Sequence, residues 1–273
     1  MPASPTFPPA ANSLGLRVLS ALVLAPPVIL ALWYGRPAFD VLVGMAVLIL
    51  AWEWDRLTNN GQFGFAGIVI GLTGLGALAV VDRPILVLAV AALGALAAAL
   101  ARRRQGPHWA AFGAIYVTLP TAAILWLRHR PETGREDVLW LFAVVWATDI
   151  GAYAAGRLIG GPKLAPLISP KKTWAGLAGG MLAAALVGMG VDRLLSAEVA
   201  LAPIAIGAAI LAVISQAGDL FESFVKRHFG VKDASRIIPG HGGLLDRVDG
   251  LVAAGLAMAG YTLYESVGGA KAW

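Results

Sequence analysis

Cysteine is absent from this 273-residue chain, and charged residues are scarce. The missing thiols exclude disulfide bonds, thiolate metal sites and a cysteine nucleophile. Charged side chains make up 14% of the residues, far below the share of about a quarter that is usual in soluble domains, whereas 58% of the residues are hydrophobic. The sequence also has no G-x-S-x-G elbow and no Walker loop, so it offers no serine nucleophile of that kind and no P-loop. These absences favour a membrane protein over a soluble enzyme.

Apolar residues form nine segments that approach the roughly 20 residues needed to cross a bilayer. The sequence therefore predicts an all-α, polytopic integral membrane protein with about nine transmembrane helices. Several segments are rich in Gly and Ala, which let helix backbones approach closely in lipid. The predicted spans are 16–34, 38–54, 65–81, 84–101, 109–127, 138–155, 174–191, 200–217 and 248–264.

The spans are expected to form one integrated membrane domain. Residues 1–15 are predicted to be a disordered tail, because the start of the chain is rich in Pro and Ala and lacks the basic residues of a signal peptide. Residues 16–135 are expected to form the N-terminal transmembrane helices, and residues 136–273 a second transmembrane region, which carries the polar stretches and is the expected place of any catalytic site. Pro26 and Pro27 predict a kink in the first span.

Basic residues indicate the orientation of the spans. With nine spans, 14 Lys and Arg residues lie on the side of the N-terminus and 7 on the other, and nine of the 14 belong to two polar stretches, without which the count would not set the orientation. The positive-inside rule places this side in the cytoplasm. The net charge of +5 is explained by this topology and by anionic lipid, so nucleic acid is not expected as a partner. We expect a multi-pass protein of the cell inner (cytoplasmic) membrane, with its polar stretches facing the cytoplasm.

The first polar stretch begins inside the sixth predicted span. Asp149 lies in an apolar run, four residues before Tyr153, so the two share one face of a helix. An intramembrane carboxylate favours a functional role over a simple helix cap. The stretch ends with Ser169, Pro170, Lys171, Lys172 and Thr173. Ser169 or Thr173 could cap the next span and leave a phosphate-binding helix N-terminus, and a basic loop that holds lipid headgroups is the equal alternative.

The second polar stretch, residues 223–250, is called here the polar run. It contains Lys226, Arg227, Lys232, Asp233, Arg236, His241, Asp246, Arg247 and Asp249, and the segments on either side are nearly free of charge. Just before it, Asp219 lies in an apolar segment, four residues ahead of Ser223. A buried carboxylate there needs a partner, either a divalent cation or a lysine that closes the helix.

Residues 239–243 of the polar run, Pro-Gly-His-Gly-Gly, are called here the glycine turn. Gly242 and Gly243 allow a ligand to approach the backbone closely. His241 could orient a phosphate, act on a proton or bond within the turn. Asp246 and Asp249 are three residues apart and share a face if a helix begins there, which suits a hard cation such as Mg²⁺.

Four carboxylates, Asp149, Asp219, Asp246 and Asp249, are thus expected at one membrane face together with several cations. A metal that bridges phosphates and cations that hold spread negative charge are the main requirements of phosphoryl or nucleotidyl transfer. The sequence therefore predicts an enzyme of that kind.

The polar run resembles the signature of the phosphatidate cytidylyltransferase family, also called CDP-diacylglycerol synthase: S-x-apolar-K-R-x4-K-D-x-small-x2-apolar-P-x-H-G-G-apolar-x-D-R-apolar-D. Every fixed position of that pattern is matched between Ser223 and Asp249. Asp149 to Tyr153 and Ser169 to Thr173 also resemble segments of the family. The N-terminal half is similar to the family only in being apolar.

The resemblance implies the reaction of CTP with phosphatidate to give CDP-diacylglycerol and diphosphate, with Mg²⁺ and with room for a monovalent cation such as K⁺. It implies that Asp219 and Asp246 hold a metal pair, with Asp249 close by. Lys226, Arg227, Lys232 and Arg247 would steady the triphosphate and the lipid headgroup. The remaining expected substrate contacts are Asp149, Tyr153, Ser169, Lys171, Lys172, Thr173, Ser223, Asp233, His241, Gly242 and Gly243. The expected partners are CTP, phosphatidate and the bilayer, and a homodimer is an arrangement that the sequence allows.

Two alternatives stay open. A CTP-dependent kinase of a polyprenol or phytol would use similar residues, but it would need a base to activate the acceptor hydroxyl. An ion-coupled transporter would place its carboxylates near the centres of spans rather than beside glycine turns at their ends.

Overall fold

The computed structural model describes residues 14–195 and 200–268, which are almost entirely helical. The helices in these ranges are α1 (Leu14–Tyr34), α2 (Ala38–Thr58), α3 (Phe65–Ala79), α4 (Pro84–Ala101), α5 (Pro107–His129), α6 (Gly134–Leu158), α7 (Trp174–Leu195), α8 (Leu201–His228) and α9 (Leu245–Gly268). The prediction of an all-α polytopic protein with nine helical segments is confirmed. The predicted N-terminal tail lies outside the described residues except for its last two positions, which belong to α1.

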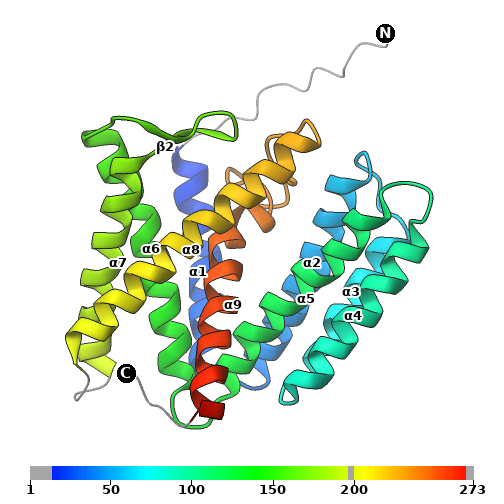
Figure 1. The fold of residues 1–273 in the computed structure, drawn as a ribbon, viewed down its shortest axis with the longest axis horizontal. Coiled ribbons are helices and arrows are strands. Elements are labelled where there is room, and N and C mark those ends of the chain that lie inside the picture. Colours follow the sequence, from blue (N-terminus) through cyan, green and yellow to red (C-terminus); the bar gives the residue numbers. More distant parts are fainter. Residues whose placement is uncertain (1–13, 196–199, 269–273) are drawn as a thin grey trace.

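The helices run up and down between two ends of the molecule (Figure 1). Helices α2 to α5 pack together as one group, α6, α7 and α8 form a second, and α9 lies between them and contacts both α5 and α8. The connections that follow α2, α4, α6 and α8 all lie at the same end of the molecule (Figure 1). Both polar stretches therefore meet at one face, as the sequence predicted.

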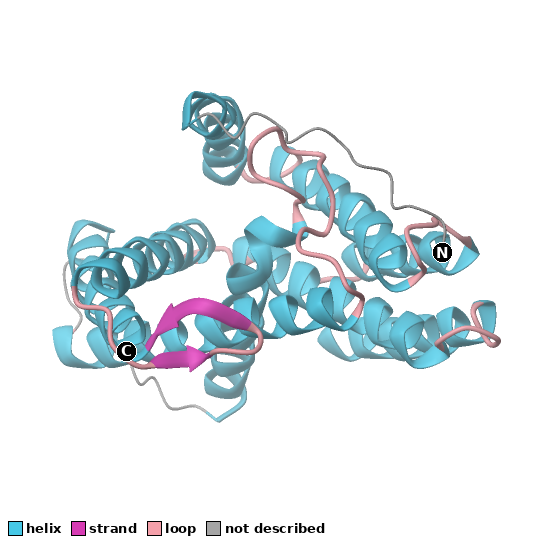
Figure 2. Ribbon diagram, turned by 90° about the horizontal axis from the view of Figure 1, so that it is seen from above, coloured by secondary structure: helices cyan, strands magenta, loops and turns pink. Residues whose placement is uncertain are grey.

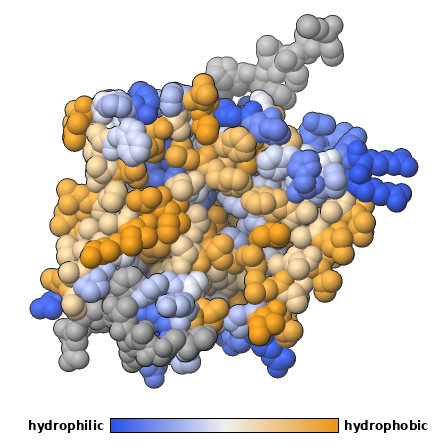
Figure 3. Space-filling view, viewed as in Figure 1, coloured by the Kyte–Doolittle hydropathy of each residue, from blue (hydrophilic) through white to orange (hydrophobic). Residues whose placement is uncertain are grey.

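The outer surface suits a bilayer. Five helices, α4 to α8, are long and apolar enough to cross a membrane by length and composition, and α3 and residues 22–34 of α1 are shorter apolar helices. Large hydrophobic side chains are exposed along them, for example Ile85, Leu93 and Leu182. In the space-filling view hydrophobic side chains dominate the middle of the molecule, and hydrophilic ones gather at its two ends (Figure 3). This band is the expected lipid-facing surface of a multi-pass protein.

Small residues bring α6 and α7 into close contact. A Cβ atom on Gly151 would overlap the Ala183 side chain, and one on Gly179 would overlap Ala155. The Gly and Ala content of these spans thus serves helix packing, as in other membrane helix pairs.

The polar stretches have more regular structure than the sequence predicted. The predicted span 200–217 ends too early, because α8 continues to His228 and carries Asp219, Ser223 and Lys226 on one helix. Residues that were expected in a loop instead form an antiparallel hairpin, in which β1 (Lys163–Ala165) pairs with β2 (Ser169–Thr173). The hairpin lies across the ends of the helices when the molecule is viewed from above (Figure 2). Helix α1 continues through Pro26 and Pro27.

Candidate active site

Asp219 lies at the centre of the polar contacts between α6, β2 and α8. Lys172 of β2 places its Nζ 2.7 Å from a carboxylate oxygen of Asp219, and Ser223 donates a hydrogen bond to the other oxygen at 3.3 Å. The Asp219 side chain keeps about a third of its surface exposed, at 32%. This carboxylate therefore stays open to a ligand while Lys172 balances its charge.

Asp149 of α6 reaches the same group through Gln216. The Gln216 side chain donates to Asp149 Oδ1 at 3.4 Å, and Lys172 Nζ donates to the Gln216 carbonyl at 3.4 Å. Asp149 also interacts electrostatically with Asp219 and Arg247, and Asp249 of α9 with both Asp149 and Asp219. Three carboxylates from three helices thus share one polar space at the end of the bundle.

Tyr153 lies one turn after Asp149, and both side chains are exposed. The Tyr153 hydroxyl accepts a hydrogen bond from Arg157 at 3.1 Å. Its ring is exposed, as are the neighbouring apolar side chains of Ile150 and Trp174, which follow Asp149 and Thr173 in the chain. The polar space therefore opens beside a surface that faces lipid.

The two adjacent lysines of the hairpin differ in their exposure to solvent. Lys171 points to solvent, whereas Lys172 is partly buried against Asp219. Thr173 is buried, and its hydroxyl accepts a hydrogen bond from the Gly176 N–H at 3.0 Å. Thr173 therefore caps α7, one of the two capping residues that the sequence proposed, and Ser169 pairs with Ala165 in the hairpin.

Asp246 is enclosed by its own polar run. One carboxylate oxygen accepts from Lys226 Nζ at 2.5 Å, and the other accepts from the N–H groups of Ala234 at 3.0 Å and Gly243 at 2.8 Å. Lys226 also pairs with Glu222, one turn earlier on α8. Lys226 is only 8% exposed, so it lies between two buried carboxylates.

Three other basic residues of the polar run have exposed side chains. Arg227, Lys232 and Arg247 are exposed, as is Asp233. Arg227 donates to the Val231 carbonyl at 2.9 Å, which holds the chain as it leaves α8. Arg247 projects from the first turn of α9, next to the helix N-terminus. An exposed guanidinium at this place suits a phosphate oxygen.

His241 and Gly242 lie in the glycine turn, where the turn touches α1. The Ser20 hydroxyl lies 2.8 Å from His241 Nδ1 and donates to the Pro239 carbonyl at 2.9 Å. Gly242 has a φ of +88°, a conformation that favours glycine. The His241 ring thus contacts a residue of α1, in the other half of the chain, and its action on a phosphate or a proton stays a prediction.

The sequence analysis missed several residues that complete this site. Gln216 and Glu222 lie on α8, and Glu53 comes from α2, in the half of the chain that carried no motif. The signal for Glu53 was present, because it is a carboxylate inside an apolar span. Its partner could not be inferred, because that partner lies about 190 residues away.

The donor set fits a hard divalent cation bound together with phosphates. In the described part of the chain no group of three or more His, Cys, Asp or Glu side chains forms a ready-made metal cage. Mg²⁺ needs only one or two carboxylates when substrate phosphates complete its shell. Asp219, which is open, and Asp249, which interacts with it electrostatically, are the carboxylates that could supply these ligands.

Comparison with known proteins relates nearly the whole chain to one protein family. A sequence model of the Cytidylyltransferase family matches residues 15–265. Proteins named phosphatidate cytidylyltransferase are similar over nearly their full length. The protein from Brucella suis is 38% identical over 250 residues, covering 89% of this chain and 91% of its own. The protein from Haemophilus influenzae is 35% identical, covering 87% and 94%, and that from Pseudomonas aeruginosa is 34% identical, covering 87% and 93%.

Proposed function

This chain belongs to the cytidylyltransferase family, and we propose that it transfers the cytidylyl group of CTP to phosphatidate, giving CDP-diacylglycerol and diphosphate. It is a nucleotidyltransferase embedded in a membrane. One observation carries the proposal. The side chains of Asp149, Lys172 and Asp219 lie together next to α9, beside a lipid-facing surface.

The substrates fit the two sides of this site. Phosphatidate has an anionic headgroup on acyl chains that stay in the bilayer, and Asp149 and Lys172 adjoin exposed Ile150 and Trp174. The headgroup could therefore reach the polar space while its chains rest against α6 and α7. CTP would approach from the water, where Arg247 and Lys232 are exposed. We place this face in the cytoplasm, where CTP is made, and the protein in the cell inner membrane.

The reaction needs positioning more than proton transfer. An oxygen of the phosphatidate phosphate forms a bond to the α-phosphorus of CTP, and the bond from that phosphorus to the β-phosphate oxygen breaks. The attacking phosphate is already anionic, so no general base is needed. Lys172 and Arg247 would hold phosphate oxygens in line and balance the charge that moves to the leaving diphosphate.

The carboxylates would hold the metal. We propose that Asp219 and Asp249 bind Mg²⁺, because Asp219 is open and Asp249 of α9 interacts with it electrostatically. The family resemblance also makes Asp246 a ligand, but both of its oxygens accept hydrogen bonds from Lys226 and the backbone. Bound Mg²⁺ would neutralise phosphate charge and orient the triphosphate.

The test is an assay of purified protein in detergent with CTP, phosphatidate and Mg²⁺. Label at the α-phosphate of CTP should enter the lipid, and label at the γ-phosphate should leave as diphosphate. Entry of the γ-label into lipid would instead identify a CTP-dependent lipid kinase. Absence of phosphatidate-dependent diphosphate release would refute the proposal and would favour the alternative of an ion-coupled transporter.

A further inference from the structure

Glu53 is a carboxylate buried in α2, in the half of the chain where the sequence analysis found no motif. Its side chain is fully buried, at 0% exposed. An ionised carboxylate in such a place is costly unless hydrogen bonds compensate it. Among the described residues, its three hydrogen-bonding partners all belong to the polar run, on the other half of the chain.

The three contacts converge on the start of α9. Glu53 Oε1 accepts from the Leu244 N–H at 2.9 Å and from the Ser235 hydroxyl at 2.5 Å, and Oε2 accepts from the Leu245 N–H at 2.6 Å. Leu245 is the first residue of α9. Glu53 therefore satisfies free N–H groups at the N-terminus of that helix, where a negative charge is also favoured by the helix dipole.

The glycine turn is shaped to admit this carboxylate. A Cβ atom on Gly243 would lie 2.5 Å from Glu53 Oε1 and 3.1 Å from Asp246 Oδ2. Gly243, the last glycine of the turn, is thus required by two carboxylates, one from α2 and one from α9. The end of the glycine turn is held between Glu53 and Asp246, because Asp246 accepts hydrogen bonds from the N–H groups of Gly243 and Ala234.

We propose that Glu53 is a positioning residue: it fixes the first turn of α9, and so sets where Arg247 and Asp249 lie relative to the carboxylates of Asp149 and Asp219. This inference rests on the proposed function only for its catalytic consequence. It also gives the N-terminal half of the chain a role in the reaction, because Glu53 of α2 holds the start of α9, the helix that carries Arg247 and Asp249.

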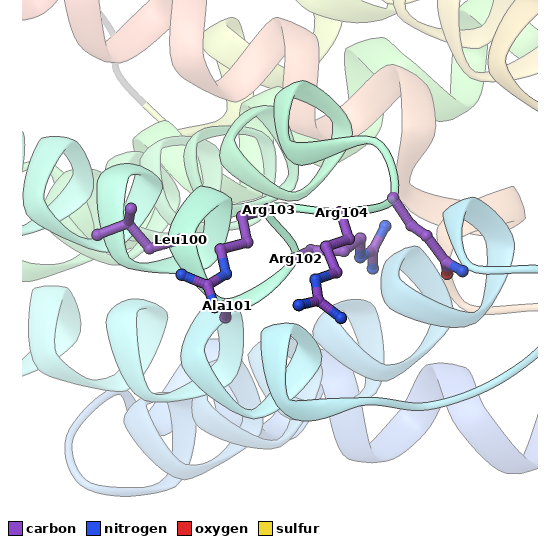
Figure 4. Close-up of a pocket in the computed structure, with 6 residues that line it drawn as sticks. Leu100, Ala101, Arg102, Arg103 and Arg104 are labelled. Carbon is purple, nitrogen blue, oxygen red and sulfur yellow. The ribbon is translucent and has the colours of Figure 1, made fainter.

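A matched control lies two residues further along the same helix. Asp55 is equally buried, at 0% exposed, but its partners belong to the N-terminal half: Arg102 in the loop after α4 and the Gly64 N–H at 2.6 Å. Arg102 is buried, whereas the neighbouring Arg103 and Arg104 are exposed (Figure 4). Asp55 therefore shares the burial and charge of Glu53 without touching the polar run.

The experiment compares Glu53→Gln with Asp55→Asn. In Glu53→Gln one acceptor oxygen becomes an NH₂ donor that faces N–H donors, so the contacts with Leu244 and Leu245 cannot all be kept. Amide hydrogen exchange of peptides from the start of α9 should be faster in Glu53→Gln and unchanged in Asp55→Asn. The kcat of Glu53→Gln should fall at least about tenfold, with a smaller change in KM, since a misplacement on the order of 1 Å can cost that much or more.

Asp55→Asn should lower the melting temperature while its kcat stays near wild type. If both variants give the same losses, or if Glu53→Gln keeps wild-type exchange and kcat, the positioning role is wrong. Should Glu53→Gln fail to fold, Ser235→Ala removes only one of the three hydrogen bonds. It should then speed exchange at Leu244, and unchanged exchange would equally overturn the inference.

Hydrogen exchange also separates this inference from the proposed function. Wild-type protein that makes no CDP-diacylglycerol would refute the function, whereas the exchange comparison would still decide whether Glu53 holds the start of α9.

Discussion

Replacing Lys226 with Met should unfold or strongly destabilise the protein rather than simply weaken substrate binding. The family resemblance implies that this lysine steadies substrate phosphates. In the structure its ammonium group instead pairs with Glu222 and with Asp246 Oδ1 at 2.5 Å, and all three side chains are buried. The described residues give Glu222 no hydrogen-bond donor besides this ion pair.

The size of the effect follows from the number of charges left unpaired. Lys226→Met keeps most of the aliphatic volume but leaves two carboxylates buried without a cation. Removing one partner of a buried ion pair costs about 3–5 kcal/mol. Such a loss is a large part of the roughly 5–15 kcal/mol that stabilises a typical folded domain. Glu222→Gln in the same background removes one of the two unpaired charges, so the double variant should recover part of the stability.

Thermal unfolding in detergent, followed by circular dichroism, would measure these differences. Lys226→Met should melt well below wild type, and Lys226→Met with Glu222→Gln should melt between the two. A Lys226→Met protein that melts at the wild-type temperature, with a raised KM for CTP or phosphatidate, would show that Lys226 contacts substrate. The ion-pair argument would then be refuted.

Three further predictions concern the open part of the site and its orientation. Asp219→Asn should lower turnover at least ~10²-fold without changing the melting temperature, and near-normal diphosphate release would contradict a metal-binding role. Arg247→Lys should raise KM for CTP or phosphatidate, because a fork-shaped donor is lost; unchanged KM for both substrates would remove the phosphate contact. Single cysteines replacing Leu167, which is 94% exposed in the hairpin, and Glu132 should react differently with an impermeant thiol reagent in intact cells. Position 132 should be labelled and position 167 should not; labelling of 167 from outside would overturn the cytoplasmic orientation.

The positions of the helices could be predicted because a bilayer imposes a simple rule on the sequence. About 20 apolar residues are needed to span it, and every predicted segment overlaps a helix of the structure. The ends of helices were predicted less well where polar residues continue a helix beyond the apolar part. Helix α8 reaches His228 because Asp219, Glu222 and Lys226 find partners at its polar end, and hydropathy carries no information about those partners.

The hairpin of β1 and β2 was not predicted for a related reason. Residues 163–173 include two prolines and three lysines, follow Gly160 and Gly161, and lack the alternation of a half-buried strand. The strands β1 and β2 are held in place because they pair with each other and because Lys172 contacts Asp219. Both are tertiary effects that no local pattern reports.

By itself the sequence determined the membrane class, the approximate helices and the chemical type of the site, because these depend on composition, apolar length and the spacing of charged residues. Only the tertiary structure decided which charges stay open and which are enclosed. Asp219 and Asp246 look alike in the sequence, yet one faces Lys172 at the surface and the other is enclosed by Lys226 and backbone N–H groups. The structure also brought Glu53 to the start of α9 from a motif-free helix. The reason is that burial and hydrogen bonding depend on which residues pack against each other across the bundle. Such residues can be almost 200 positions apart in the chain, as Glu53 and Leu245 are.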